Sequence, residues 1–350
     1  MHPKILAVAK ALPPFTKSTE EILPRVEEWL APLPERDQRK ILRIFKYAQV
    51  DRRYSIMDME NVFKETSWED KNAFFCEKAV ELGQQALENA LAKTDLTPQD
   101  IDFIITVSCT GFMIPSMDAE IINRLNMRQD IVRLPVTEMG CAAGTSALIY
   151  ANEFLKANPT KRAAIISVES PTSTFQHQDW RMTNMVSAAI FGDGAACAIL
   201  GPTEEVRPQI LDTHMYHYYE ALHFMGYNVR NTGFEMVLDI SVPEEIEKRF
   251  PDILYPFLEK NGLSVDQVDH FIFHPGGKKI VQMVEGLLHG LGKNVDDSKT
   301  VLREYGNMSS ATVLYVLERF MDRNLPAGDK GLMLAFGPGF SAQRLLLEWG

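Results

Sequence analysis

One cysteine stands where a thiol is readily activated. Cys141 follows a predicted strand at residues 131–134 and opens an apolar helix expected to run from Ala142 to Leu155. An ordinary thiol, with a pKa of about 8.5, is only a few per cent thiolate at neutral pH. The free N–H groups and the dipole of a helix N-terminus favour the anion. We therefore predict that Cys141 is a nucleophile. The alternative is a buried, inert thiol, which we expect for Cys76 and Cys197.

Two further side chains could act with this thiol. His274 ends a buried strand and precedes Pro275-Gly276-Gly277, a position where α/β proteins place ligand-binding groups. A core histidine bonded to the backbone would fit the same pattern. Asn307 precedes a second apolar helix, from Met308 to Phe320, and alone would indicate only a helix cap. An internal repeat favours a functional role, because it gives Asn307 the position that Cys141 holds in the other half.

Signals for a metal or a nucleotide cofactor are weak. His214, His217 and His223 could form a metal site, but interleaved tyrosines and the lack of acidic or cysteine ligands favour a solvated loop. The glycines at 192–194 and 337–339 fit turns and match neither the Rossmann nor the P-loop fingerprint. The sequence therefore predicts no metal and no cofactor.

The elements that must position these residues occur twice. Residues 96–105 and 263–272 match in their leading Leu, in Thr/Ser and in an Ile/Val-Asp pair before an apolar strand. A helix opened by a capping-box pattern at Ser67, and another at Ser241, precedes each copy. Continuous apolar strands alternating with helices predict an α/β fold with helices on both faces of the sheets. A chance match is the alternative. We place the halves at residues 1–201 and 202–350, packed as one unit.

Composition narrows the class of protein. The chain has 350 residues, 45% of them apolar, and a net charge of −11, which disfavours nucleic acid and anionic membranes as partners. No apolar run reaches the ~18 residues of a membrane span. The apolar stretch within the first ten residues is too short for a signal peptide. Four cysteines without a CxxC pair predict free thiols in a reducing compartment, so we expect a cytoplasmic protein.

Five motifs narrow the family. They are Gly140-Cys141-Ala142-Ala143-Gly144, Phe191-Gly192-Asp193-Gly194, His274-Pro275-Gly276-Gly277, Tyr305-Gly306-Asn307-Met308 and Phe336-Gly337-Pro338-Gly339. In order and spacing they resemble type III polyketide synthases, the chalcone synthase family of the thiolase superfamily, from about residue 5 to the C-terminus. The resemblance implies the layered αβαβα thiolase fold, a homodimer, and direct use of CoA esters without an acyl carrier protein. It assigns catalysis to Cys141, His274 and Asn307.

The resemblance also assigns roles to individual residues outside the catalytic set. Phe191 and Met236 correspond to two gatekeepers between the CoA tunnel and the cavity, the second with Met in place of Phe. Cys109 stands where plant enzymes have a cavity Thr, and Ser187 where they have Gly. Thr174 and Ser309 match cavity residues. Ile114 matches the Met that enters the partner subunit's cavity. Basic residues in the segments where the family binds CoA, or next to the histidine motif, are Lys46, Arg52, Arg53, Lys278 and Lys279; ordinary solvated charge is the alternative for each.

The resemblance implies a malonyl-CoA-dependent acyltransferase. Such an enzyme loads a starter on Cys141, condenses it repeatedly with malonyl-CoA and cyclises the product. The departures from the plant pattern suit bacterial relatives that make alkylpyrones or alkylresorcinols. One alternative is an enzyme like ketoacyl-ACP synthase III, which performs a single condensation. Another is a catalytically silent acyl-CoA-binding protein on the same fold.

Overall fold

A computed structural model describes residues 2–350, and its largest element is a sheet of nine strands. Their order is β11-β12-β13-β8-β1-β7-β6-β4-β5. In chain order these strands are β1 (Lys4–Ala11), β4 (Phe103–Val107), β5 (Val132–Val136), β6 (Ala163–Glu169), β7 (Gly194–Gly201), β8 (Pro208–His217), β11 (His270–Phe273), β12 (Lys330–Gly337) and β13 (Ser341–Trp349).

The sheet consists of two halves with the same strand order. From the middle outward, one half runs β1, β7, β6, β4 and the other runs β8, β13, β12, β11. In both, the outer neighbours (β6 with β4, and β12 with β11) are parallel and the inner pairs antiparallel. The ninth strand, β5, pairs parallel with β4 at the edge of the first half and has no counterpart in the second. Between β1 and β8, where the two halves of the sheet join, Lys4 and Gln209 form the single register pair. The internal repeat of the sequence is therefore also a repeat of strand order and direction.

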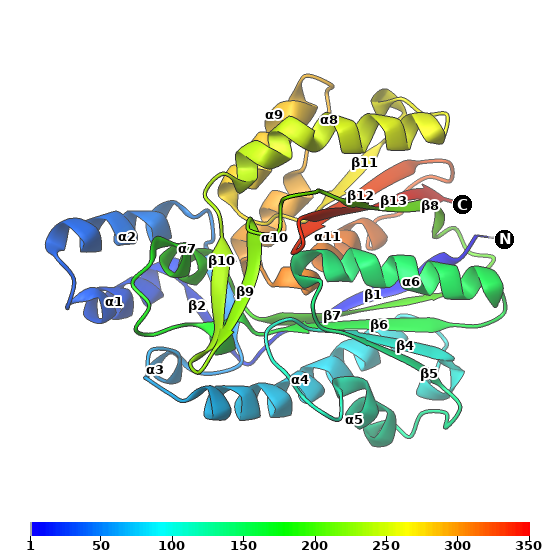
Figure 1. Ribbon diagram of the computed structural model, residues 1–350. Coiled ribbons are helices and arrows are strands. Elements are labelled where there is room, and N and C mark those ends of the chain that lie inside the picture. The colour runs from blue at the N-terminus through cyan, green and yellow to red at the C-terminus, as the bar shows by residue number, and fades with distance from the viewer. Residues whose placement is uncertain (1) are drawn as a thin grey trace.

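The helices form three layers around the two half-sheets (Figure 1). Helices α4 (Trp68–Leu91) and α5 (Met117–Arg124) cover the outer face of the first half, and α8 (Val242–Lys260) and α9 (Lys278–His289) lie on the far side of the second. Helices α6 (Ala143–Ala157) and α11 (Thr312–Met321) lie between the half-sheets and contact strands of both. This is the αβαβα arrangement expected from the sequence. No helix within residues 2–350 is long and apolar enough to cross a membrane.

The two helices that precede the repeated segments begin where the sequence predicts, but only one has the predicted cap. The Ser67 side chain accepts a hydrogen bond from the Asp70 N–H at 3.0 Å, which caps α4. The Ser241 hydroxyl instead donates to the carboxylate of Asp239, and α8 has no side-chain cap. The capping-box prediction at Ser241 is therefore wrong, because a nearer acceptor precedes the helix.

The central helices approach each other closely where their first turns meet. The 3₁₀ turns η2 (Gly140–Ala142) and η5 (Ser309–Ala311) lead into α6 and α11. A Cβ added at Gly144 would lie 2.3 Å from the carbonyl oxygen of Ser310, so the contact requires glycine. Cys141 is the middle residue of η2, and Ser310 is the middle residue of η5. Counted from these turns, Asn307 lies three residues before the position equivalent to Cys141; counted from the strand pairs β4/β11 and β6/β12, each offset by 167 residues, it lies one residue before that position.

A smaller group of elements lies beside the layers and forms the walls of the site (Figure 1). Strands β9 (Met225–Arg230) and β10 (Gly233–Leu238) pair only with each other, as do β2 (Phe15–Ser18) and β3 (Arg52–Ser55). The helices of this group are α1 (Thr19–Leu30), α2 (Glu35–Tyr47), α3 (Met59–Val62) and α7 (Met182–Ile190), with α10 (Asp296–Tyr305) packed on β3.

Candidate active site

A cavity of about 290 Å³ brings the three predicted catalytic side chains together. Cys141, His274 and Asn307 all line it, although they come from η2, from the end of β11 and from the residue pair before η5. Backbone hydrogen bonds fix Asn307 beside the residue that ends α7: its N–H donates to the Ile190 carbonyl at 2.8 Å, and its carbonyl accepts from Gly192 at 3.1 Å. The site therefore lies where the two halves of the fold meet.

The turn that carries Cys141 depends on close packing. Gly140 has a φ of +49°, and an added Cβ would lie 2.6 Å from the Pro338 ring. The partly buried thiol lies in apolar surroundings that raise its pKa to about 11. The polar side chains of Ser309 and Asn307 oppose that shift, while the carboxylate of Glu169 adds to it. Helix position alone therefore does not make this thiol acidic.

The imidazole ring of His274 is buried and makes no hydrogen bond to the residues that the structure describes. It is 4% exposed, and neither ring nitrogen has a partner among the described residues. Burial lowers its pKa to about 3, because the charged ring would lose its hydration. Burial thus favours a neutral thiol beside a neutral imidazole. A thiolate–imidazolium pair therefore needs the mutual attraction of the two charges, in addition to the hydrogen bonds of Ser309 and Asn307, to offset burial.

The amide of Asn307 is held in one orientation. Its Oδ1 accepts from the Ser309 N–H at 2.9 Å and from the Thr312 hydroxyl at 3.3 Å. Its Nδ2 donates to the Gly276 carbonyl at 3.0 Å. An amide nitrogen carries two N–H donors, so one remains for a ligand in the cavity. Asn307 is therefore a preorganised, neutral hydrogen-bond donor.

A buried carboxylate lies behind the cavity, and the sequence analysis missed it. Glu169 ends the apolar strand β6 and is fully buried. It accepts from the Cys109 N–H at 3.0 Å, from the Thr110 hydroxyl at 2.8 Å and from the Ser310 hydroxyl. Burial raises its pKa. An acidic residue closing a continuous apolar strand was the signal that could have revealed it.

The predicted cavity residues divide between two spaces. Cys109 and Ser309 line the reaction cavity, with Sγ and Oγ 3.3 Å apart. Thr174 and Ser187 line a second cavity instead. Phe191 and Met236 line both and thus lie between them.

Ile114 lies apart from both cavities. Its side chain is 82% exposed, beside Phe112 at 51%. In one subunit it is therefore an exposed apolar side chain, which leaves its predicted entry into a partner's cavity as a prediction.

Tyr227 is an aromatic wall of the reaction cavity that the sequence analysis did not single out. It lies on β9, and its ring faces the space near Cys141 and Cys109. Burial raises the pKa of its hydroxyl well above the ordinary value. Hydrogen bonding with the side chain of Thr174 opposes that shift. An alternating strand in a loop-rich segment gave no indication that this side chain points inward.

The predicted CoA-binding residues do not all share one surface. Lys278 begins α9 with its Nζ 6.0 Å from the centre of the Tyr47 ring, so the end of α2, which carries exposed Lys46, adjoins Lys278 and Lys279. Arg52 is also exposed. Arg53 is 9% exposed and donates to the Ala188 carbonyl at 2.8 Å and to Thr19 at 3.2 Å. Its burial separates it from the other four.

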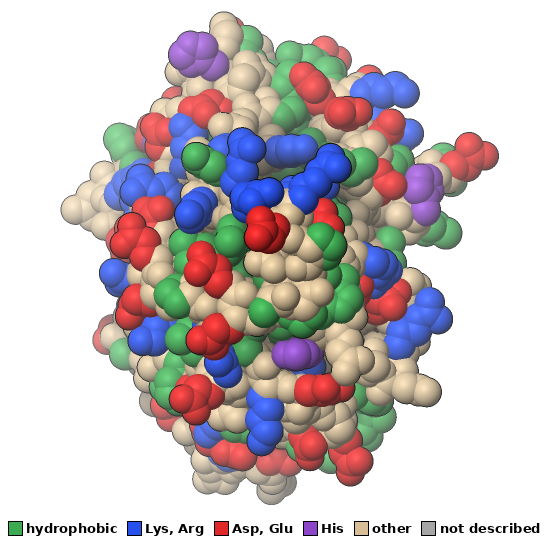
Figure 2. All heavy atoms as spheres, turned by 90° about the vertical axis from the view of Figure 1, so that its left-hand side faces the viewer, with side chains coloured by type: hydrophobic (Ala, Val, Ile, Leu, Met, Phe, Trp, Pro, Cys, Tyr) green, Lys and Arg blue, Asp and Glu red, His purple; other side chains and the backbone are tan. Residues whose placement is uncertain are grey.

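A basic face of α2 extends the surface around Lys46. Arg36, Arg39, Lys40 and Arg43 surround a surface hollow on this helix, and a helical spacing of three and four residues places them on one side. Figure 2 shows Lys and Arg side chains gathered around a hollow on the face of the molecule that carries α1 and α2. In a chain of net charge −11, this is a local cationic patch.

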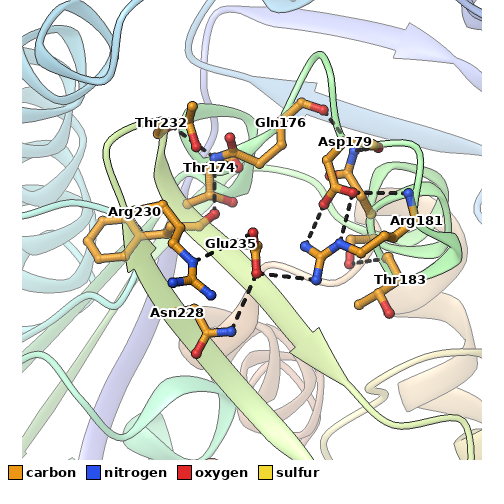
Figure 3. A network of polar contacts seen from close by, with 12 residues as sticks. Thr174, Gln176, Asp179, Arg181, Thr183, Asn228, Arg230, Thr232 and Glu235 are labelled. Atoms are coloured by element: carbon orange, nitrogen blue, oxygen red, sulfur yellow. Dashed lines mark hydrogen bonds and ion pairs between the residues drawn. The ribbon is translucent and has the colours of Figure 1, made fainter.

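The β9–β10 hairpin is attached to the site through side chains (Figure 3). The Gln176 amide donates to the carbonyls of Thr232 at 3.1 Å and Phe234 at 3.2 Å. Glu235 on β10 pairs with Arg181 at 3.2 Å, and Arg181 also binds Asp179 at 2.6 Å. These contacts hold the hairpin, and with it Tyr227 and Met236, against the loop before α7.

The histidines of the predicted metal alternative can be compared with their surroundings in the fold. Among residues 2–350, no group of three or more His, Cys, Asp or Glu side chains is arranged to hold a metal ion. His214, the first histidine of the predicted metal alternative, lies on β8 with its Nδ1 against the guanidinium of Arg344.

Comparisons with known proteins agree along the whole chain. The family model "FAE1/Type III polyketide synthase-like protein" matches residues 59–212, and "Chalcone and stilbene synthases, C-terminal domain" matches residues 220–349. A 1,3,6,8-tetrahydroxynaphthalene synthase from Streptomyces peucetius subsp. caesius is 32% identical over 99% of this chain and 93% of its own length. A phloroglucinol synthase from Pseudomonas fluorescens is 32% identical over 88% of both chains.

Solved structures resemble the fold over its full length. The crystal structure of 1,3,6,8-tetrahydroxynaphthalene synthase from Streptomyces coelicolor has a TM-score of 0.90 and 29% identity, covering 99% of each chain. That of a polyketide synthase from the brown alga Ectocarpus siliculosus has a TM-score of 0.91 and 27% identity, covering 100% of this chain and 98% of the other.

Proposed function

The chain belongs to the type III polyketide synthase family, and we propose that it loads an acyl group from CoA onto Cys141 and extends it with malonyl-CoA. Each extension is a decarboxylative Claisen condensation, and the product is released after cyclisation. One observation carries the proposal: a thiol, an imidazole and an oriented amide line a single cavity at the junction of the two halves.

His274 is the proposed proton acceptor in the loading step. The imidazole takes the Cys141 proton as the sulfur attacks the thioester carbonyl of the starter. The tetrahedral intermediate then collapses and expels the CoA thiolate, which recovers the proton from the imidazolium. Because neither ring nitrogen of His274 has a hydrogen-bond partner among residues 2–350, both can bond to the thiol and the substrate.

His274 and Asn307 are the proposed donors in decarboxylation. They bind the thioester carbonyl oxygen of malonyl-CoA, which becomes the enolate oxygen as the bond to the leaving carbon dioxide breaks. The enolate carbon attacks the acyl thioester on Cys141 and releases the cysteine thiolate. The chain is then two carbons longer and is bound to CoA. Since the Asn307 amide is fixed by Ser309 and Gly276, this donor needs no reorganisation.

The cationic surface at the ends of α2 and α9 is the proposed site for the CoA phosphates. Lys46, Lys278 and Lys279 lie together there, and Lys40 and Arg43 extend the same charge along α2. Phosphate groups need such a patch on a protein that is acidic overall. Arg53 is left out of this site, because its guanidinium is buried.

The exposed segment around Ile114 is the proposed contact between two subunits of a homodimer. Phe112 and Ile114 are large apolar side chains that are exposed to solvent in a single subunit. A contact between subunits would bury them. We predict that Ile114→Asp converts a dimer to a monomer in sedimentation velocity experiments. A control substitution at another exposed position, Leu222→Asp, is expected to leave the dimer intact. A dimer that persists in Ile114→Asp at micromolar concentration would place the interface elsewhere.

A starter panel tests the proposed activity. The enzyme is incubated with acyl-CoA esters and labelled malonyl-CoA, and products are identified by mass. A ring product with at least two labelled extensions is expected. A single condensation would favour the activity of a ketoacyl-ACP synthase III-like enzyme. No product, with Cys141 no more reactive than a free thiol, would favour a silent acyl-CoA-binding protein.

A further inference from the structure

Two titratable groups beside the reaction cavity have no part in the mechanism above. Cys109 lies in the segment after β4, and Glu169 is the last residue of β6. The sulfur of Cys109 lies 3.6 Å from each carboxylate oxygen of Glu169. An ionised carboxylate only accepts hydrogen bonds, so the thiol donates to it. The wall of the cavity that contains Cys141 therefore carries a second thiol with its own proton acceptor.

This second thiol and the catalytic thiol share one hydroxyl group. The Oγ of Ser309 lies 3.3 Å from the sulfur of Cys109 and also hydrogen-bonds to the sulfur of Cys141. Burial raises the pKa of Cys109 well above that of an ordinary thiol, and the charges of Glu169 and Cys141 add to the shift. Cys109 follows the end of β4 and Cys141 lies in a short 3₁₀ turn. The two sulfurs therefore line one space, next to the same side chain.

The other two cysteines lie elsewhere in the fold. Cys197 is buried within β7, where burial raises the pKa of its thiol. Cys76 is on α4, with its sulfur 3.5 Å from the carbonyl oxygen of Phe112. The arrangement of two thiols at one cavity is thus specific to Cys109 and Cys141, and the other two cysteines serve as internal controls.

We propose that Cys109 is a resolving thiol, which forms a reversible disulfide with Cys141 when hydrogen peroxide oxidises the catalytic sulfur. Reactive thiols that are oxidised reversibly often have a second cysteine beside them. The disulfide would stop the enzyme and would protect Cys141 until a dithiol reduces it. This inference goes beyond the proposed function, since it requires a reactive Cys141 but no polyketide formation.

The oxidation consists of two steps. In the first, His274 takes the Cys141 proton and the thiolate attacks one oxygen of hydrogen peroxide; the O–O bond breaks, Cys141 becomes a sulfenic acid, and the departing hydroxide recovers the proton as water. In the second, Glu169 takes the Cys109 proton and the Cys109 sulfur attacks that of Cys141. The S–O bond breaks, and hydroxide leaves with the proton from Glu169 as a second water. Two thiols are oxidised and one peroxide is reduced.

Peptide mapping of the full chain tests the disulfide directly. The protein is treated with hydrogen peroxide, digested without reduction and analysed by mass spectrometry. The expected product is the peptide of Cys109 joined to that of Cys141, lighter than their sum by two hydrogen atoms. Dithiothreitol is expected to restore the labelling of Cys141 by iodoacetamide to the level of untreated protein. Cys141 found only as sulfinic or sulfonic acid, or joined to Cys76 or Cys197, would overturn the proposal.

Removing the second thiol tests its role. In Cys109→Ser, the sulfenic acid lacks its resolving thiol, so the same peroxide dose is expected to carry Cys141 to sulfinic acid, and dithiothreitol should restore less than about a tenth of the labelling. Cys76→Ser, the matched control, should recover like the unaltered protein. Glu169→Gln should slow disulfide formation at least about tenfold, because the amide cannot take the thiol proton.

Recovery and polyketide formation are measured separately on each variant. Equal recovery in Cys109→Ser and in the unaltered protein would refute the proposal, even if the enzyme makes polyketides. A loss of recovery confined to Cys109→Ser would support it, even if no polyketide were formed. Should Glu169→Gln fail to fold, the comparison of Cys109→Ser with Cys76→Ser still decides.

Discussion

The reactivity of Cys141 offers the sharpest test of the proposed proton transfer. Burial raises the pKa of this thiol to about 11, and the carboxylate of Glu169 adds to the shift. Replacing His274 with Gln should therefore leave a thiol with that pKa. At pH 7 its thiolate fraction would be about 10⁻⁴, whereas a free thiol of pKa 8.5 has about 3%. The difference is roughly 300-fold.

Nucleophilicity offsets part of that difference. A thiolate of higher pKa attacks faster, with a Brønsted coefficient of about 0.4–0.5, so 2.5 pKa units return roughly tenfold. We therefore expect His274→Gln to react with iodoacetamide about 30-fold more slowly than a free thiol at pH 7. Its rate should rise about tenfold per pH unit up to pH 9.5, because the thiolate fraction grows throughout this range. In the unaltered enzyme, proton transfer to His274 should give a faster and flatter profile.

The assay follows the modified Cys141 peptide by mass spectrometry between pH 6 and 9.5. Site-specific detection is needed because Cys76, Cys109 and Cys197 are also free. His289→Gln, at an exposed position on α9, controls for loss of a histidine in general. If His274→Gln and the unaltered enzyme shared one rate and one pH profile, His274 would not be the base for this thiol.

Three further outcomes follow from the described contacts. Cys141→Ala should abolish polyketide formation but retain acetyl-CoA release from malonyl-CoA, whereas Asn307→Ala should lower that release by about 100-fold or more, measured by thioester chromatography; equal losses would contradict the division of roles. Met236→Phe should slow octanoyl-CoA more than acetyl-CoA in steady-state assays, because a ring is harder to displace than a Met side chain, and an equal effect on both would show that Met236 does not limit entry of the starter. Gly144→Ala should destabilise the fold by about 1–3 kcal/mol in urea unfolding, because the added methyl meets a backbone carbonyl of the opposite half. Gly286→Ala, in open space on α9, should stabilise by about 0.5–1 kcal/mol, and a reversed order would refute the packing argument.

Local patterns were sufficient to place Cys141 and His274 in the fold. In the sequence, the hydrophobic period changes where a helix starts or a strand ends. The repeat predicts that the equivalent helix starts of the two halves face one centre. The pairing of Asn307 with Cys141 is displaced by one to three residues, because motif spacing does not show where the 3₁₀ turns before α6 and α11 begin.

The side chains that face each cavity could not be predicted from spacing. Arg52 and Arg53 are adjacent charged residues on β3, and strand alternation exposes the first and buries the second. Two like residues in succession give no polar–apolar alternation from which to read the inner face. Thr174 and Ser187 fall outside the reaction cavity because Tyr227, Phe191 and Met236 stand between, which depends on side-chain volume rather than on sequence position.

The isolation of the β9–β10 hairpin has a consequence for how such an enzyme can diversify. None of its ladder hydrogen bonds belongs to the nine-stranded sheet, and side-chain contacts of Gln176, Glu235 and Trp68 hold it in place. Substitutions at inward positions such as Tyr227 and Met236 therefore leave the pairing of the large sheet and the packing of α6 against α11 untouched. Selection can alter the volume open to a growing chain at little cost to folding, while Cys141, His274 and Asn307 stay on the rigid layers.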